Sequence, residues 1–261
     1  MRGVGSARVR LHGDLADFTR PATGARADTS AVVEKVARFE GRPALKDVIE
    51  SVGPPHPEVD LVLLDGVPRP LDALARDGAV VDVFPVGLGP AGHARLAPPP
   101  RRPERFLLDG HLGRLAALLR MLGFDARWER DAADERLAQL SVDEARVLLT
   151  RDVGLLKRGV VRRGAFIRAV RPRAQVDEVV ARFQLREDAR PFSRCIRCNA
   201  PLRDVPTAEA APRLPPRVRE RHQRFLACDG CGRLYWAGTH QERMRGVVAE
   251  VLGKARDDGP A

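Results

Sequence analysis

Acidic side chains stand just after two short apolar runs in the middle of the chain. Asp109 follows the run Phe106–Leu108, and Asp152 follows the run Ala145–Thr150 after a single arginine. Apolar runs of this length predict buried strands, and ligands of open α/β sheets bind beyond the carboxyl ends of the strands. The two carboxylates therefore have the positions expected of a ligand site. Aspartate is also a frequent helix cap, and capping explains Asp109 alone equally well.

Further acids lie between these two in the sequence, at Asp131, Asp134 and Glu135. Clustered carboxylates repel one another unless a cation lies among them. Hard divalent ions such as Mg²⁺ or Mn²⁺ take oxygen ligands, leave positions for water and phosphate, and can orient water for attack on a phosphodiester. The acids thus predict a metal-dependent phosphodiesterase. The alternative is that they cap helices and pair with surface arginines.

Basic residues flank the proposed site and suit a phosphate substrate. Arg151 can bind phosphate through its guanidinium fork and Lys157 as a point charge, while Arg114 lies on the predicted helix after Asp109. Each of them can instead be a solvated or helix-facing basic residue. His111 is expected to be structural, because metal-aided hydrolysis needs no imidazole.

The four cysteines of the chain form two Cys-x-x-Cys pairs, Cys195 with Cys198 and Cys228 with Cys231. Without a secretory signal, this pairing indicates a metal rather than disulfides. Four thiolates match the closed tetrahedral shell of structural Zn²⁺, which leaves no position open to water. The segment between the pairs is rich in proline and arginine, so we expect a partly irregular insertion. Tyr235-Trp236 can stack on bases, although such aromatics more often pack against the zinc subdomain.

The charge of the chain is +10 and unevenly spread. Residues 1–90 carry 11 basic and 13 acidic side chains, whereas residues 91–261 carry 34 and 22. A basic field of this size favours a polyanion partner. No apolar run is long enough for a membrane span, and the first residues do not resemble a signal peptide. These features predict a soluble cytoplasmic protein without a membrane partner, and they leave the oligomeric state open.

The chemistry-bearing residues need elements that position them, and the apolar pattern predicts two sets of elements. In the first part of the chain it predicts strands at 7–12, 32–39, 59–64 and 79–86 and a helix at 44–51. In the second part it predicts strands at 106–108, 126–129, 145–150 and 165–170, alternating with helices at 112–122, 134–140, 154–158 and 176–185. Such alternation indicates a parallel sheet flanked by helices.

The first part of the chain resembles the ubiquitin-like β-grasp sulfur-carrier family. The resemblance rests on the element order, on Val-x-Leu-Val-Leu-Leu-Asp-Gly at 59–66 and on Asp-Gly-Ala-Val-Val-Asp-Val-Phe-Pro at 77–85. Sulfur carriers end in a free Gly-Gly, but here Gly87-Leu88-Gly89 runs on into more chain. We therefore interpret this domain as a docking or regulatory module for a protein partner, or as a stabilising appendage.

The second part resembles the PIN-like RNase family found at the C-terminus of mutator-type exoribonucleases, which often follows a ubiquitin-like domain. The matching motifs are 105–122, Asp134-Glu135-x-Leu137 and 148–157, and Thr150-x-Asp152 matches PIN nucleases at large. The resemblance implies a metal-dependent nuclease with Asp109, Asp134 and Asp152 as ligands, Glu135 as the alternative to Asp134, and Thr150 at the substrate site. PIN enzymes often have a fourth acid after the next strand, and residues 167–171 offer none.

We therefore predict an α/β chain with a PIN-like parallel sheet flanked by helices, preceded by an α+β ubiquitin-like β-grasp domain and followed by a zinc ribbon. The predicted modules are 1–88 (β-grasp), 89–103 (Pro-rich linker), 104–188 (nuclease core) and 189–261 (ribbon and tail). The predicted function is RNA hydrolysis with catalytic Mg²⁺ or Mn²⁺ and structural Zn²⁺. The alternatives are a catalytically weak or inactive RNA-binding adaptor and a β-grasp-led scaffold for proteins.

Overall fold

The chain divides into two compact units. A computed structural model describes residues 3–19, 30–96 and 98–253, so residues 254–261 of the predicted tail lie outside the described residues. The first unit comprises residues 1–100 and 131–170, and the second comprises residues 101–130 and 171–261. Residues 104–188 thus contribute to both units.

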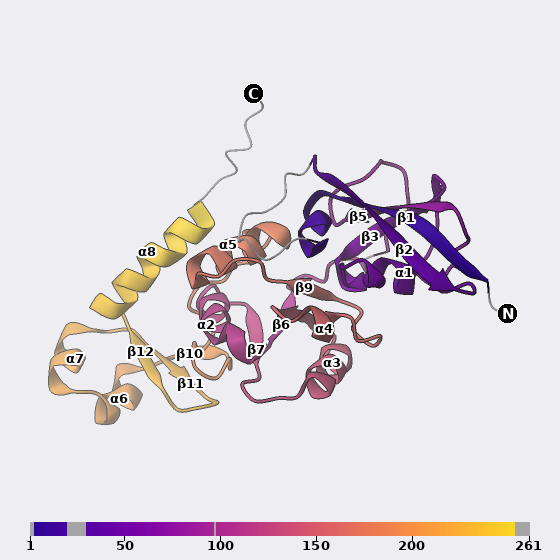
Figure 1. The fold of residues 1–261 in the computed structure, drawn as a ribbon. Coiled ribbons are helices and arrows are strands. Elements are labelled where there is room, and N and C mark those ends of the chain that lie inside the picture. The colour runs from indigo at the N-terminus through magenta and orange to yellow at the C-terminus, as the bar shows by residue number, and fades with distance from the viewer. Residues whose placement is uncertain (1–2, 20–29, 97, 254–261) are drawn as a thin grey trace. The chain divides into compact units, whose positions relative to one another are not determined.

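A mixed five-stranded sheet in the order β2-β1-β5-β3-β4 forms the N-terminal part of the first unit (Figure 1). β1 runs parallel to β5 and antiparallel to β2, and β3 runs antiparallel to β5. Together with the helix α1, this sheet has the predicted ubiquitin-like fold. The elements are Val4–His12 (β1), Gly13–Thr19 (η1), Val32–Glu40 (β2), Leu45–Ser51 (α1), His56–Glu58 (η2), Val59–Leu64 (β3), Val67–Pro68 (β4) and Ala79–Pro85 (β5).

Alternating apolar residues create the core of this domain. Ala7, Val9 and Leu11 of β1 are buried on one face of the sheet, where they join the buried side chains of α1. Burial of a valine or leucine side chain such as Val9 or Leu11 contributes about 1.5–3 kcal/mol. Asp65 and Gly66 have φ values of 49° and 79°, as a two-residue hairpin turn requires. The turn pairs β3 with the short strand β4, which the sequence analysis did not predict.

The remaining elements of the first unit are α3 (Asp134–Asp143), β8 (Val147–Thr150), α4 (Val153–Leu156) and β9 (Gly164–Phe166). α3 continues beyond its predicted end near Leu140, because the first chain reversal comes only at Ala145, which has a φ of 50°. The following strand therefore begins at Val147. β9 is shorter than the predicted 165–170, because its parallel pairing with β8 stops where β8 ends.

The second unit contributes two strands and three helical segments to the α/β region. They are β6 (Arg105–Leu108), η3 (Gly110–Leu112), α2 (Gly113–Met121), β7 (Asp125–Trp128) and α5 (Pro172–Arg182). The central sheet is all-parallel, in the order β7-β6-β8-β9, with helices flanking it. α5 starts earlier than the predicted 176, because Pro172 occupies its first turn, where proline is favoured.

The four cysteines lie in a small subdomain of the second unit, residues 191–236, hereafter the four-cysteine subdomain. It is built on an antiparallel sheet in the order β10-β11-β12. Its core consists of Val205, Ala210, Leu214, Phe225 and Ala227. The segment between the cysteine pairs, predicted to be partly irregular, contains β10 and β11, and between these two strands it has only short helices. The elements are Leu202–Val205 (β10), Thr207–Ala210 (α6), Ala211–Arg213 (η4), Pro216–Arg221 (α7), Phe225–Cys228 (β11) and Leu234–Trp236 (β12).

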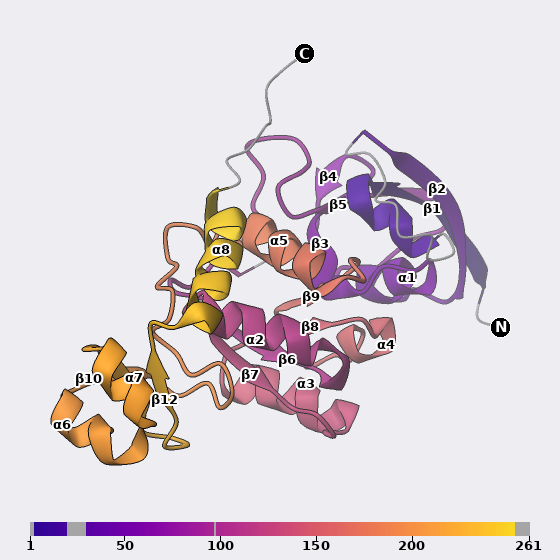
Figure 2. The same cartoon turned by 90° about the vertical axis from the view of Figure 1, so that its left-hand side faces the viewer.

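A helix that the sequence analysis did not predict, α8 (Thr239–Gly253), follows this subdomain. It lies beside α5 (Figure 2), and Arg173 of α5 donates a hydrogen bond to the carbonyl of Val247 at 2.9 Å. Val248 and Val251 are buried. Within the described parts of the chain, no helix has the length and apolar character needed to cross a membrane.

Candidate functional site

Asp109 lies in a tight turn at the carboxyl end of β6. Its Oδ1 accepts a hydrogen bond from the His111 N–H at 2.9 Å, and the residue is 5% exposed. A Cβ on Gly110 would lie 2.3 Å from the carbonyl oxygen of Arg130, so this turn requires glycine. Trp128 Nε1 donates to the Gly110 carbonyl at 3.3 Å. Asp109 therefore does cap the next turn, and because a carboxylate offers about four lone-pair positions, capping is compatible with ligation.

Asp152 caps α4 in the same manner. Its Oδ1 accepts hydrogen bonds from the N–H groups of Gly154 at 2.7 Å and Leu155 at 3.2 Å. The Asp152 N–H in turn donates to Oγ1 of Thr150 at 2.9 Å, and Thr150 is fully buried. The Thr-x-Asp motif thus fixes the backbone from which the Asp152 carboxylate projects.

Asp134 and Glu135 begin α3, where a carboxylate interacts favourably with the helix dipole. Their side chains are 43% and 73% exposed. Arg158 pairs with both, at 3.6 Å from Asp134 and 2.8 Å from Glu135. The backbone N–H of Glu135 itself and then Arg158 lower the pKa of Glu135. Arg158, which the sequence analysis did not single out, therefore balances the charge of this acidic pair.

The predicted phosphate-binding residues differ in their surroundings. The Arg151 guanidinium donates to the carbonyl of Ala169 at 2.8 Å. Lys157 Nζ donates to the carbonyl of Glu50 at 2.6 Å, and burial lowers the pKa of Lys157. Arg114 is exposed near the start of α2. Two of these three cations therefore bind backbone carbonyls of the first unit.

The four cysteines are not joined by disulfides, and their Sγ atoms all lie within 4.8 Å of one another. The Sγ–Sγ distance is 3.6 Å between Cys195 and Cys231 and 3.3 Å between Cys198 and Cys228. A tetrahedral ion with bonds of about 2.3 Å to sulfur requires about 3.8 Å, so the cluster needs little adjustment to hold one. Among the described residues, this is the one group of three or more ligating side chains with such closely spaced donor atoms.

Two family models match the chain. Residues 104–248, more than half of its length, match the Mut7-C RNAse domain. The chain belongs to the Mut7-C RNase family. Residues 5–88 match the Mut7-C ubiquitin domain. The predicted family, with a ubiquitin-like domain in front of the RNase region, is therefore confirmed. No curated protein and no solved structure matches the chain.

The thiols of the Mut7-C four-cysteine cluster differ in acidity. Burial alone raises the pKa of Cys195, but hydrogen bonds from the Tyr235 hydroxyl and from the backbone of Cys198 and Arg197 outweigh burial and lower this pKa to about 6. Burial raises the pKa of Cys228 to about 12. Burial, followed by the contact with Cys195, also raises the pKa of Tyr235. The lowered pKa favours the thiolate form of Cys195, which suits a cation site.

Arg120 of the Mut7-C RNAse region attaches the first cysteine pair to α2 and β7. It is 6% exposed, and its guanidinium donates to the carbonyls of Ile196 at 3.1 Å, Arg197 at 2.8 Å and Ala126 at 2.8 Å. Asn199 adds a second connection, because its Oδ1 accepts from the Ala126 N–H at 3.0 Å. The loop that carries Cys195 and Cys198 is therefore held by hydrogen bonds to residues outside the four-cysteine subdomain.

The Mut7-C ubiquitin domain packs on residues 157–168 of the first unit. Arg168, whose side chain is 9% exposed, has its guanidinium 3.6 Å from Asp14, 3.4 Å from Asp17 and 3.7 Å from Glu58. The guanidinium also lies 5.0 Å from the ring centroid of Phe18. These ion pairs were not predictable from the sequence, because all three acidic partners of Arg168 lie more than a hundred residues away along the chain.

Replacing Arg168 with alanine is expected to lower the free energy of unfolding by about 2–3 kcal/mol, because the change leaves the buried carboxylate of Glu58 and the partly buried carboxylates of Asp14 and Asp17 without their cation. Urea unfolding of the full chain measures the difference. Arg162→Ala is the matched control, since Arg162 is exposed, and it should change stability by less than about 0.5 kcal/mol. Equal stability of the two variants would show that the ion cluster does not hold the domain.

Proposed function

We propose that this Mut7-C protein is a divalent-metal-dependent ribonuclease that hydrolyses phosphodiester bonds of RNA. The observation that carries the proposal is the position of Asp109 and Asp152. Each follows a strand of one all-parallel sheet and caps the next turn, within the region that matches the RNAse model. Asp134 is the third proposed ligand, and Glu135 is its alternative.

The proposed chemistry follows from the donor set. Carboxylate oxygens suit Mg²⁺ or Mn²⁺, so Asp109, Asp152 and Asp134 would hold such an ion, which would supply activation of water and neutralisation of charge on the phosphate. Asp109 and Asp152 offer their oxygens from turns held by backbone hydrogen bonds, so little ordering is needed on binding. Arg114 is exposed and available to a phosphate. Arg151 and Lys157 must exchange their carbonyl partners for phosphate before they can take the same role.

We propose zinc for the four-cysteine cluster, in a structural role. The Sγ distances fit a tetrahedral ion, and four sulfur ligands leave no position for a reacting water. The basic excess of residues 91–261 supports RNA as the polyanion.

The test is cleavage of single-stranded RNA by the purified full chain in metal-depleted buffer. We expect cleavage to require added Mn²⁺ or Mg²⁺ and to stop when that ion is withdrawn, while Zn²⁺ alone does not restore it. Single-stranded DNA of the same sequence serves as the comparison substrate. Intact RNA in the presence of either ion would overturn the proposal.

One observation favours a second candidate, an RNA-binding adaptor without activity. Residues 167–171, which directly follow β9, contain no acid. Arg168 in this segment pairs instead with Asp14, Asp17 and Glu58 of the ubiquitin-like domain. PIN enzymes often have an acid there. RNA binding without any cleavage would support this candidate. Binding of a protein partner to the ubiquitin-like domain is compatible with either.

A further inference from the structure

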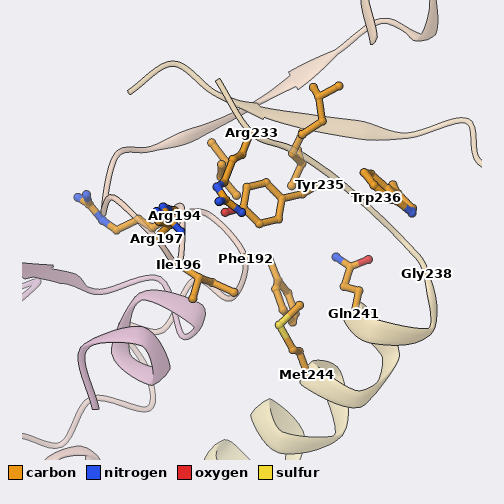
Figure 3. Close-up of a pocket in the computed structure, with 13 residues that line it drawn as sticks. Phe192, Arg194, Ile196, Arg197, Arg233, Tyr235, Trp236, Gly238, Gln241 and Met244 are labelled. Atoms are coloured by element: carbon orange, nitrogen blue, oxygen red, sulfur yellow. The ribbon is translucent and has the colours of Figure 1, made fainter. Parts of the chain in front are cut away.

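A cavity of 540 Å³ lies beside the four-cysteine cluster in the second unit (Figure 3). The loop of the first cysteine pair, strand β12 and the first half of α8 provide its walls. Its volume falls within the usual range for small-molecule sites. The residues that matter here are Phe192, Arg197, Arg233, Tyr235, Trp236 and Gln241.

Three aromatic rings contribute to the cavity wall. The Tyr235 hydroxyl lies 3.1 Å from Cys195 Sγ, which fixes the position of the ring next to the cluster. Trp236 packs against the core of the four-cysteine subdomain, as the sequence analysis expected, yet it also lines the cavity. Phe192 lies across the cavity from β12 (Figure 3). All three rings are only partly buried, so they offer apolar faces on which a planar group can stack.

The polar groups of the cavity are cationic. Arg194, Arg197 and Arg233 line it, and the described lining contains no carboxylate. The guanidinium of Arg194 already has a hydrogen-bond acceptor, because it donates to the Asn199 carbonyl at 2.7 Å. Arg197 and Arg233 are exposed, and within the described parts of the chain their guanidinium groups form no ion pair. This combination selects a ligand that carries both planar rings and negative charge.

Gln241 points independently to a ligand with hydrogen-bond donors. Its side-chain amide faces the cavity (Figure 3). Its Oε1 is buried and has no hydrogen-bond partner among the described residues. A buried acceptor without a partner is unfavourable, so a donor from a bound molecule would stabilise the site. The N–H groups on the edge of a nucleobase are donors of this kind.

We propose that this cavity binds an unpaired base of single-stranded RNA. Tyr235 or Trp236 stacks on the base, Gln241 accepts a hydrogen bond from its edge, and Arg197 and Arg233 bind the flanking phosphates. The inference rests on the proposed function, because it takes RNA as the substrate, and it adds a binding site separate from the acidic residues. A base within a duplex is already stacked and paired, so the site selects unpaired strands.

Fluorescence anisotropy of the full chain with a labelled 12-nucleotide single-stranded RNA tests the arginines. The buffer contains no Mg²⁺ or Mn²⁺, so that the strand stays intact. The double variant Arg197→Ala/Arg233→Ala is expected to bind at least tenfold more weakly. Arg219→Ala/Arg221→Ala removes the same charge from exposed positions on α7 and should stay within threefold of the parent. Equal affinities of the two double variants would overturn the proposal.

Tryptophan emission tests stacking separately from charge. Single-stranded RNA should quench the emission of the parent, and the quench should be lost in Trp236→Phe, which keeps an aromatic ring in the packing. A duplex of the same sequence should not quench this emission. A free mononucleotide at equal concentration should not quench it either, because it lacks the flanking phosphates that Arg197 and Arg233 bind. Metal content of each variant confirms that the four-cysteine subdomain is intact. A quench that persists in Trp236→Phe would contradict the stacking role.

Cleavage assays separate this inference from the proposed nuclease activity. If the parent binds RNA through Arg197 and Arg233 but never cuts it, the cavity is supported as an RNA-binding site and the adaptor function replaces the nuclease function. If the parent cuts RNA and the double variant binds and cuts equally well, the nuclease stands and the cavity is not an RNA site.

Discussion

Replacing Asp152 with asparagine is expected to reduce RNA cleavage by at least two to three orders of magnitude, roughly 3–4 kcal/mol in the activation barrier. Asparagine keeps the size of the side chain and remains a good helix cap, so the hydrogen bonds to Gly154 and Leu155 survive. Only the negative charge that a divalent ion needs is lost. Initial rates with single-stranded RNA and Mn²⁺ measure the change, while RNA affinity through the arginines should largely persist.

Asp109→Asn should give the same loss, because Asp109 has the corresponding position after β6. Stability should hold or rise in both variants, since removal of carboxylate repulsion offsets the lost interactions in the metal-free protein. Asp143→Asn is the control, because Asp143 lies at the end of α3 and forms an exposed hydrogen bond with Gln139. Parent-like cleavage by both Asp109→Asn and Asp152→Asn would mean that the nuclease site lies elsewhere.

Removal of the metal from the four-cysteine cluster is expected to unfold residues 191–236 while the ubiquitin-like domain stays folded. Structural zinc contributes about 10–16 kcal/mol to the folding of small zinc domains at neutral pH, and the apolar core here has only five buried members. Cys228→Ser should have the same effect as a chelator. Metal analysis should find about one zinc ion per chain of the parent.

Hydrogen exchange resolves where the unfolding occurs. Amides of β10, β11 and β12 should lose protection, whereas those of β1 and β5 should keep it. Asp229→Asn is the matched control, because Asp229 is adjacent to Cys228 and forms only an exposed ion pair with Arg203 at 2.8 Å. A metal-free chain with a fully protected β11 would contradict the prediction.

The residues that short-range rules govern were predictable. The apolar run before Asp109, the Cys-x-x-Cys spacing and the Asp65-Gly66 turn each depend on neighbours within a few positions. Their local structure follows from the period of apolar residues, from the spacing of the cysteines and from the φ values that Asp and Gly tolerate. The fold of both the ubiquitin-like domain and the parallel sheet followed from the order of such segments.

The residues whose role depends on distant partners were not predictable. Arg168 reads as an ordinary basic residue until Asp14 and Glu58 are brought beside it. Arg158 acquires its role only when α4 packs against α3. Tertiary contacts of this kind leave no periodic trace in the sequence. α8 is a different case, because Met244, Val247, Val248, Val251 and Leu252 recur at helical spacing. The sequence therefore carries the signal of this helix, and the sequence analysis missed it.

The hydrogen bonds of Arg120 have a consequence for how this chain can be divided. A fragment that stops before the first cysteine pair would keep the buried guanidinium and discard the carbonyls of Ile196 and Arg197 that accept from it. A chain that is cut or recombined at that position would therefore carry a buried arginine without two of its hydrogen-bond acceptors and would be less stable. The part of the α/β region that carries Arg120 and the four-cysteine subdomain are thus one structural unit, and a fragment without the second would expose or strand the buried cation of the first.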